Sequence, residues 1–325
     1  MSKKKWIYRI VGILFLLGFL SPNCLGWGFF AHKRINHQAI FSLPPEMMVW
    51  YRPHIKYITR HAPDPDKRRY AVKGEAPHHF IDIDHYGSYP FSNLPRDWES
   101  AVRKFSKDTL QKYGTVPWYA LKVFYKLQHA FERKDLSAIL KHSIFLGHYI
   151  ADACVPLHAT SNYDGQKTNQ KGIHALWESE IPELFADTSF QYWNGKAEYI
   201  KDPGDYIWDL VLTSAKEADS VLTVEKKLLE SYPAGEVHAF IERKGSVVRR
   251  FSVGFSNAYN QALNGMVNRK MNKAIHAVAS LWYTAWVNAG QPNLKITNGK
   301  VKTDEHSGDL KEIKKDPSLE THQKR

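Results

Sequence analysis

Apolar residues recur every three or four positions through most of the chain beyond residue 26, the spacing that gathers side chains on one face of a helix. The first such stretch runs from residue 29 to the prolines at 44 and 45, and a second begins there and is broken by the proline at 53. We find no run that alternates apolar and polar residues as a half-buried strand would. The pattern therefore predicts an all-α protein, with further helices over residues 98–113, 116–134, 136–154, 174–186, 206–231, 247–262 and 268–289.

The segment from residue 61 to 95 loses this periodicity and is rich in His, Asp, Pro and Gly. An irregular stretch of this length inside a compact chain is usually functional or disordered. Its concentration of His and Asp favours a functional role, and a polar surface loop is the alternative. A second, shorter polar loop is predicted over residues 162–171.

The two ends of the chain differ from its body. Residues 1–26 combine a basic start, an apolar run too short to cross a bilayer and a small residue at the end, which predicts a secretory signal peptide; a retained membrane anchor is the alternative. Cleavage before Trp27 would make the protein secreted or periplasmic. Residues 292–325 are polar and lack aromatic residues, so we expect a disordered tail, with a docking tail as the alternative. Residues 27–291 are then expected to form a single domain.

The 325-residue chain carries a formal charge of +12 at pH 7, and four of its basic residues lie in the predicted signal peptide. An excess of positive charge suits anionic partners, either nucleic acid or a phospholipid surface, without deciding between them. Of the two cysteines, only Cys154 lies in the predicted domain. No intramolecular disulfide is therefore expected, and Cys154 is interpreted as a core residue.

Two pairs of His and carboxylate residues stand out within the helical pattern. His148 and Asp152 are four residues apart, as are His174 and Glu178, so each pair would project from one face of its helix. His158 follows on the chain as it leaves the first of these helices, which a proline should end. Imidazole nitrogens and carboxylate oxygens are ligands that zinc accepts. The spacing therefore predicts a metal site.

These pairs, the segment Trp27-Gly-x-x-x-His32 and the segment from His79 to Asp82 resemble the superfamily of zinc-dependent phospholipases C and single-strand-specific zinc nucleases of the S-one and P-one type. The resemblance covers residues 27–178. It implies an all-helical domain whose cleft holds three zinc ions and hydrolyses phosphodiesters with a metal-activated water. A nuclease that cuts single-stranded DNA or RNA to 5'-nucleotides is the favoured reading. A phospholipase C is the alternative, and a zinc-binding protein without activity is the third possibility.

The resemblance also implies a ligand set. Asp66 competes with Asp64 for one position and His78 with His79 for another; Asp64 and His79 are preferred because they keep the nuclease spacing and the His-Phe-Ile-Asp context. The implied ligands are Trp27 (through its amine and carbonyl), His32 and Asp152 for one zinc; Asp64, His79, His148 and the bridging Asp152 for a second; and His158, His174 and Glu178 for a third.

Other residues would act on the substrate. The nucleases carry an arginine three residues after their loop aspartate to hold the phosphate, and here Lys67 stands at that position with Arg68 beside it. Phe80 matches the base-stacking aromatic residue, and Asp82 matches the residue that binds the base edge. Glu178 is the last ligand in the phospholipases, where the nucleases usually have Asp. A phospholipase would need an apolar rim that faces lipid, and the sequence does not indicate one.

Overall fold

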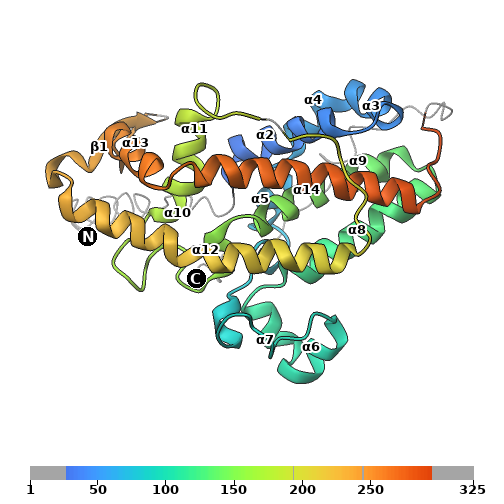
Figure 1. The fold of residues 1–325 in the computed structure, drawn as a ribbon, viewed down its shortest axis with the longest axis horizontal. Coiled ribbons are helices and arrows are strands. Elements are labelled where there is room, and N and C mark those ends of the chain that lie inside the picture. Colours follow the sequence, from blue (N-terminus) through green and yellow to red (C-terminus); the bar gives the residue numbers. More distant parts are fainter. Residues whose placement is uncertain (1–26, 193, 244, 295–325) are drawn as a thin grey trace, which may run out of the picture.

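The computed structural model describes residues 27–192, 194–243 and 245–294, and helices make up most of this part of the chain (Figure 1). The predicted signal peptide, and all but the first three residues of the predicted tail, lie outside the described residues. The α-helices are α2 (Phe29–Ala39), α3 (Pro45–Tyr51), α4 (Ile55–His61), α5 (Asp64–Arg68), α6 (Trp98–Phe105), α7 (Lys107–Lys112), α8 (Val116–Glu132), α9 (Leu136–Ala153), α10 (Ile173–Ala175), α11 (Ile181–Phe185), α12 (Pro203–Ser231), α13 (Val253–Ala262) and α14 (Met266–Asn288).

Short helical turns connect several of these helices. The longest is η7, a π-helical segment that joins α10 to α11, where a single helix over residues 174–186 was predicted. A π-helix is wider than an α-helix and is often found at functional sites. These turns are η2 (Ile40–Ser42), η3 (Arg52–His54), η4 (Ala76–His79), η5 (Ile83–Tyr86), η6 (Pro156–Ala159), η7 (Leu176–Glu180) and η8 (Ala234–Glu236).

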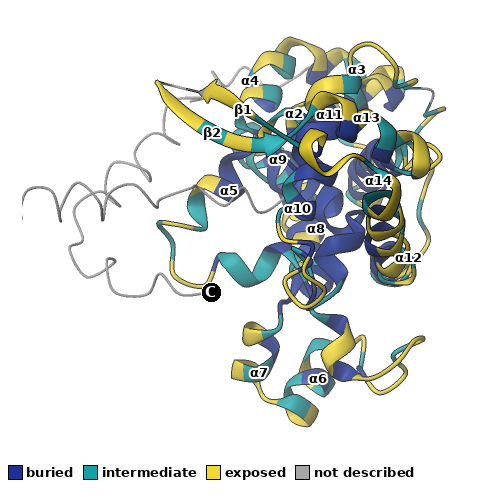
Figure 2. Cartoon of the chain, turned by 90° about the vertical axis from the view of Figure 1, so that its left-hand side faces the viewer, coloured by how far each residue is buried: buried dark blue, intermediate teal, exposed yellow. Residues whose placement is uncertain are grey.

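Helix α9 lies at the centre of the fold because it is apolar on nearly all sides, and every residue from Ser143 to Ala153 is buried. The carboxylate of Asp135 caps its first turn by accepting a hydrogen bond from the Ala138 amide at 3.0 Å. Helices α2, α8, α12 and α14 pack around it, and Figure 2 shows the buried residues concentrated there. Gly147 permits the close approach of α2, since a Cβ at this position would lie 2.2 Å from the Asn36 side chain.

Helices α6 and α7 stand apart from the main helical body in both views (Figures 1 and 2). One helix was predicted over residues 98–113, but the chain breaks at Ser106, whose φ of 68° lies in the left-handed region. The Ser106 hydroxyl then caps α7 by accepting a hydrogen bond from the Thr109 amide at 3.3 Å. The break therefore divides the predicted helix in two.

The described part of the chain agrees with the all-α prediction except at one hairpin. Residues 238–251 form an antiparallel hairpin in which β1 (His238–Arg243) pairs with β2 (Ser246–Phe251). A helix was expected to begin at Val247, but α13 begins six residues later, at Val253. Ser252 fixes that start, because its hydroxyl accepts a hydrogen bond from the Phe255 amide at 3.1 Å.

The C-terminal end of the described chain packs against α14. Leu294 is buried, and the indole of Trp286 donates a hydrogen bond to the carbonyl oxygen of Pro292 at 3.0 Å. Within the described residues, none of the helices combines the length and apolarity needed to span a membrane.

Candidate metal centre

Helix α9 supplies the first two side chains of the site. Nε2 of His148 lies 3.3 Å from Oδ2 of Asp152, so the spacing of four residues brings the pair together as predicted. The other ring nitrogen of His148 is 2.9 Å from the carbonyl oxygen of Ala62, at the end of α4. A hydrogen bond from Nδ1 to this carbonyl leaves Nε2 facing the site as the atom that could bind a cation.

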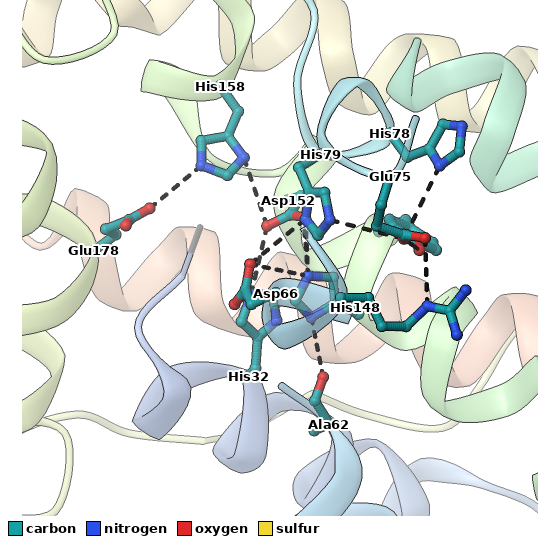
Figure 3. A network of polar contacts seen from close by, with 12 residues as sticks. His32, Ala62, Asp66, Glu75, His78, His79, His148, Asp152, His158 and Glu178 are labelled. Carbon is teal, nitrogen blue, oxygen red and sulfur yellow. Dashed lines mark hydrogen bonds and ion pairs between the residues drawn. The ribbon is translucent and has the colours of Figure 1, made fainter. Parts of the chain in front are cut away.

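Helix α2 and turn η4 bring two further imidazoles to Asp152 (Figure 3). The ring of His32 stacks on that of His148 with centroids 3.7 Å apart, and its Nε2 lies 3.4 Å from Oδ1 of Asp152. Nδ1 of His79 lies 3.0 Å from Oδ2 of Asp152. The neighbouring His78 points elsewhere, because its ring stacks on Tyr119 at 3.4 Å. The structure thus places His79 rather than His78 in the site, in agreement with the preference from the sequence.

The preference for Asp64 over Asp66 is not supported by the structure. Oδ1 of Asp66 lies 3.6 Å from both His79 and His148, whereas the Asp64 carboxylate is bound by His61 at 2.5 Å and Lys67 at 2.6 Å. Both aspartates lie on the short helix α5, and residues two apart on a helix point to nearly opposite sides. The side of α5 that faces α9 carries Asp66.

A third group of side chains adjoins the first two. His158 lies on η6, His174 on α10 and Glu178 on η7, and Oε2 of Glu178 is 3.3 Å from Nε2 of His158 and 2.9 Å from Nε2 of His174. Nδ1 of His158 is also 3.5 Å from Oδ1 of Asp152. Asp152 therefore contacts four histidines of the site: His32, His79, His148 and His158.

The distances fit ligands around a cation. Two ligand atoms at about 2.1 Å from a tetrahedral zinc ion lie roughly 3.4 Å apart, and the separations above lie close to this value. Several buried atoms among the described residues face the site without a hydrogen-bond partner, including Nε2 of His32, Oδ1 of Asp66 and Oδ1 of Asp152. Three ligand groups could each hold a metal ion: His32, Asp66 and His148; His79, His148 and Asp152; and His158, His174 and Glu178.

Burial and charge set the protonation of these residues. Burial lowers the pKa of His79 and His174 to about 4 each, which keeps both imidazoles neutral and able to bind a cation. Burial also lowers the pKa of His148, but the carboxylates of Asp152 and Asp66 outweigh it and raise the pKa to about 10. A divalent cation would displace the proton that His148 shares with these carboxylates.

Trp27 lies beside the site. Its indole nitrogen donates a hydrogen bond to the carbonyl oxygen of Ala151 at 2.7 Å, and its ring lies 5.0 Å from that of Trp177. The next residue, Gly28, donates its amide to the Glu178 carbonyl oxygen at 3.2 Å and packs so closely that a Cβ would lie 2.5 Å from the Ser179 hydroxyl. The chain at Trp27 is therefore fixed between α9 and η7, while ligation by its amine stays a prediction.

The two residues predicted to hold the phosphate are engaged in other contacts. Lys67 pairs with Asp64, and Arg68 lies 3.4 Å from Glu75 and over the ring of Phe145. Arg69, which the sequence analysis did not consider, acts on the site itself. Its charge helps to lower the pKa of both His79 and His174, after burial and the nearer effects of Asp152 and His148 on His79 and of Asp164 on His174.

Phe80 and Asp82 lie next to the site without entering it. Phe80 is half-buried, and its carbonyl oxygen accepts a hydrogen bond from the Val116 amide at 3.2 Å. Burial, then the charge of Asp164 and then that of the half-buried Asp82 raise the pKa of the Tyr163 phenol. The ring of Tyr163 in turn lies 5.8 Å from that of His174.

Glu75 is a buried carboxylate that the sequence analysis missed. Its Oε1 lies 3.9 Å from Nε2 of His79, on the opposite side of the ring from Asp152, and it accepts a hydrogen bond from the Tyr149 hydroxyl (Figure 3). Glu75 and His79 are four residues apart, the spacing that singled out the other two pairs. The same criterion applied to residues 61–95 would therefore have found it.

No family model matches the chain, and no curated protein matches it as a relative. The fold and the site together define a mainly helical protein with buried clusters of His, Asp and Glu that could hold metal ions. Any functional assignment therefore depends on the chemistry of these clusters.

Proposed function

We propose that this protein is a zinc-dependent phosphodiesterase of the kind that the sequence resembles. The observation that carries the proposal is the convergence of four imidazoles on the buried carboxylate of Asp152, at 3.0–3.5 Å. Neutral imidazoles with carboxylates are a zinc-binding set, and the third cluster, at Glu178, adds a further ligand group.

The charge of such a site favours an anionic substrate. Three zinc ions would bring about six positive charges, against the carboxylates of Asp66, Asp152 and Glu178, and the excess would attract a phosphodiester. When bound, zinc supplies a water of lowered pKa and offsets negative charge on the phosphoryl oxygens.

The residues of the chain have distinct roles in this proposal. Asp152 bridges the clusters and fixes their separation. The carbonyl of Ala62 orients His148 so that its Nε2 faces the site, and Glu75 adds a negative charge 3.9 Å from Nε2 of His79. With Asp66 as the loop ligand, Arg69 stands three residues later, at the position of the phosphate-holding arginine in the nucleases. Arg69 therefore replaces Lys67 and Arg68 as the residue proposed to neutralise the phosphoryl group.

Single-stranded nucleic acid is the first proposed substrate. Phe80 and Asp82 lie beside the site, where a stacked base and its edge could be bound. The positive charge of the chain supports this substrate as well.

A phospholipid is the second candidate substrate, because the β1–β2 hairpin carries exposed apolar side chains. The side chains of Phe240 and Val247 on the hairpin are 75% and 71% exposed, and they supply the apolar surface that the sequence did not indicate.

The test incubates the chain that begins at Trp27 with single-stranded DNA, RNA and phosphatidylcholine and follows the products by phosphorus NMR, with and without a chelator. Chelator-sensitive nucleoside monophosphates would support the nuclease, and phosphocholine would support the phospholipase. Asp152→Asn should lower bound zinc and turnover together, whereas Asp209→Asn, at a side chain that is 70% exposed on α12, should change neither. Full zinc and full turnover in Asp152→Asn would exclude the bridging role, and a zinc-loaded wild type without any product would contradict the proposal.

A further inference from the structure

The β1–β2 hairpin places large apolar side chains in solvent. Phe240 is 75% exposed and Val247 is 71% exposed. Phe240 and Glu242 are two residues apart on β1 and therefore point to the same face of the hairpin. Val247 on β2 is paired with Glu242, so its side chain lies on that face as well. Ile241, at 39%, is exposed on the opposite face of the hairpin, and Val253, at 62%, is exposed at the start of α13. Apolar residues gathered on one protrusion, rather than scattered singly, indicate an interaction surface.

The base of the hairpin is anchored to the helical body. The ring of His238 stacks on Phe251 at 4.8 Å, and Phe251 stacks on the buried Phe255 at 5.4 Å. The Ser252 amide donates to the carbonyl oxygen of Val237 at 2.9 Å and closes the base. An isolated two-stranded hairpin is marginally stable in water. These contacts therefore hold the two strands in place.

The hairpin is also connected to the candidate metal centre. Nε of Arg250 on β2 lies 2.8 Å from Oε1 of Glu180, which lies on η7 two residues after Glu178. The ring of Phe251 packs over Gly172, at the start of the turn that carries His174. In Figure 2 the hairpin projects on the same side of the body as α5, the helix that carries one of the clustered aspartates.

The charge and shape of the hairpin indicate its partner. The sequence from residue 238 to 251 contains four Arg or Lys residues and one Glu, and of these Arg249 and Glu242 are both exposed on the same face as Phe240. Arg250 is paired with Glu180, so Arg249 is the basic residue placed to meet a partner on that face. Basic residues are attracted to anionic lipid headgroups. Of the three most exposed apolar side chains only Phe240 is aromatic; Val247 and Val253 offer no face on which a base could stack, and aliphatic side chains fit the boundary between headgroups and acyl chains.

We propose that the hairpin docks the protein on an anionic phospholipid surface, with Phe240 and Val247 entering the headgroup region and Arg249 facing the lipid phosphates. Docking depends on neither metal nor hydrolysis, so it goes beyond the proposed function and stands apart from it. Where the substrate is a lipid, docking also brings lipid phosphates to the α5 side of the molecule.

The test measures co-sedimentation of the chain from Trp27 onward with vesicles of phosphatidylcholine, alone or mixed with equal parts of phosphatidylglycerol. The double variant Phe240→Thr/Val247→Thr removes the apolar side chains and keeps residues that favour strands. It should bind the mixed vesicles at least about tenfold more weakly than the wild type, because burial of one large apolar side chain changes a binding constant by roughly that factor. Val49→Thr, at a position 49% exposed on α3, is the matched control and should bind like the wild type.

Arg249→Gln should weaken binding to the mixed vesicles and leave binding to phosphatidylcholine unchanged, and added salt should have the same effect. Equal binding by the wild type and the double variant, or no sedimentation of the wild type with either vesicle, would overturn the proposal. A double variant that instead loses affinity for single-stranded DNA, or loses self-association in sedimentation velocity, while vesicle binding is unchanged would also overturn it. Far-ultraviolet circular dichroism and thermal unfolding check that the variants are folded.

Repeating the sedimentation with a chelator separates the two proposals. A chain that docks with and without chelator but hydrolyses no phosphodiester supports the docking role and contradicts the proposed function. A chain that hydrolyses phosphodiesters but never sediments with vesicles supports the proposed function and contradicts the docking role.

Discussion

Replacing Glu75 by Gln tests whether a buried charge beside the site stabilises it. Glu75 is 3% exposed, accepts hydrogen bonds from Tyr149 and Arg68, and lies 3.9 Å from Nε2 of His79. Glu75→Gln keeps the size of the side chain and removes its charge.

The effect of the substitution on stability follows from the pKa. Burial raises the pKa of Glu75, but His78, Tyr149, His79 and Arg68 outweigh burial and lower the pKa from 4.5 to about 2. A carboxyl group whose pKa is lower in the folded state stabilises the fold above pH 4.5, and this stabilisation is lost as the pH falls toward 2. The ionised Glu75 carboxylate therefore contributes about 3 kcal/mol to the free energy of unfolding at pH 7 and about 1 kcal/mol at pH 3.

Urea unfolding in the presence of a chelator, followed by tryptophan fluorescence, measures this difference. We expect Glu75→Gln to lower the free energy of unfolding by about 3 kcal/mol at pH 7 and by about 1 kcal/mol at pH 3. The control Glu99→Gln, at a side chain 83% exposed on α6, should change it by less than about 0.5 kcal/mol. A loss of the same size at both pH values, or none at pH 7, would show that the Glu75 carboxylate does not stabilise the fold in this way.

Three further predictions follow from the site and its surroundings. Asp66→Asn should lower the bound zinc while Asp64→Asn leaves it unchanged, as measured by metal analysis after gel filtration; the reverse result would restore the choice made from the sequence. One additional residue ahead of Trp27 should remove the amine ligand and reduce the zinc content, and an extended chain with undiminished zinc would contradict ligation by the amine. Burial and the charge of Lys126 lower the pKa of His142 to about 4, so acid favours the unfolded chain between pH 6.5 and 4. His142→Gln should therefore lose about 2 kcal/mol less stability than the wild type on going from pH 7 to 4.5, as urea unfolding would show.

The long helices could be predicted from the sequence because each buries one side or more. Helices α8, α9, α12 and α14 follow the predicted stretches with small differences at their ends. The hairpin was missed because alternation of apolar and polar residues arises only where one face of a strand is buried. Strand β2 is exposed or half-exposed along its whole length, so its apolar residues followed no strand pattern.

The site was predictable wherever sequence spacing alone determines proximity. His148 and Asp152 must meet on any α-helix that contains both. The choice between Asp64 and Asp66 could not be made in this way, because it depends on which side of α5 packs against α9. That orientation is set by tertiary contacts that the local sequence does not encode.

The complete burial of His32, His148 and Asp152 has a consequence for variant libraries. Buried charged groups that satisfy one another are often less stabilising than well-packed apolar side chains of similar size. In a library scored for protein abundance, joint apolar replacement of all three residues should therefore be tolerated, whereas replacement of one alone leaves the others buried without their charged partner and should be depleted. A triple variant that remains abundant would show that folding stability does not require His32, His148 and Asp152.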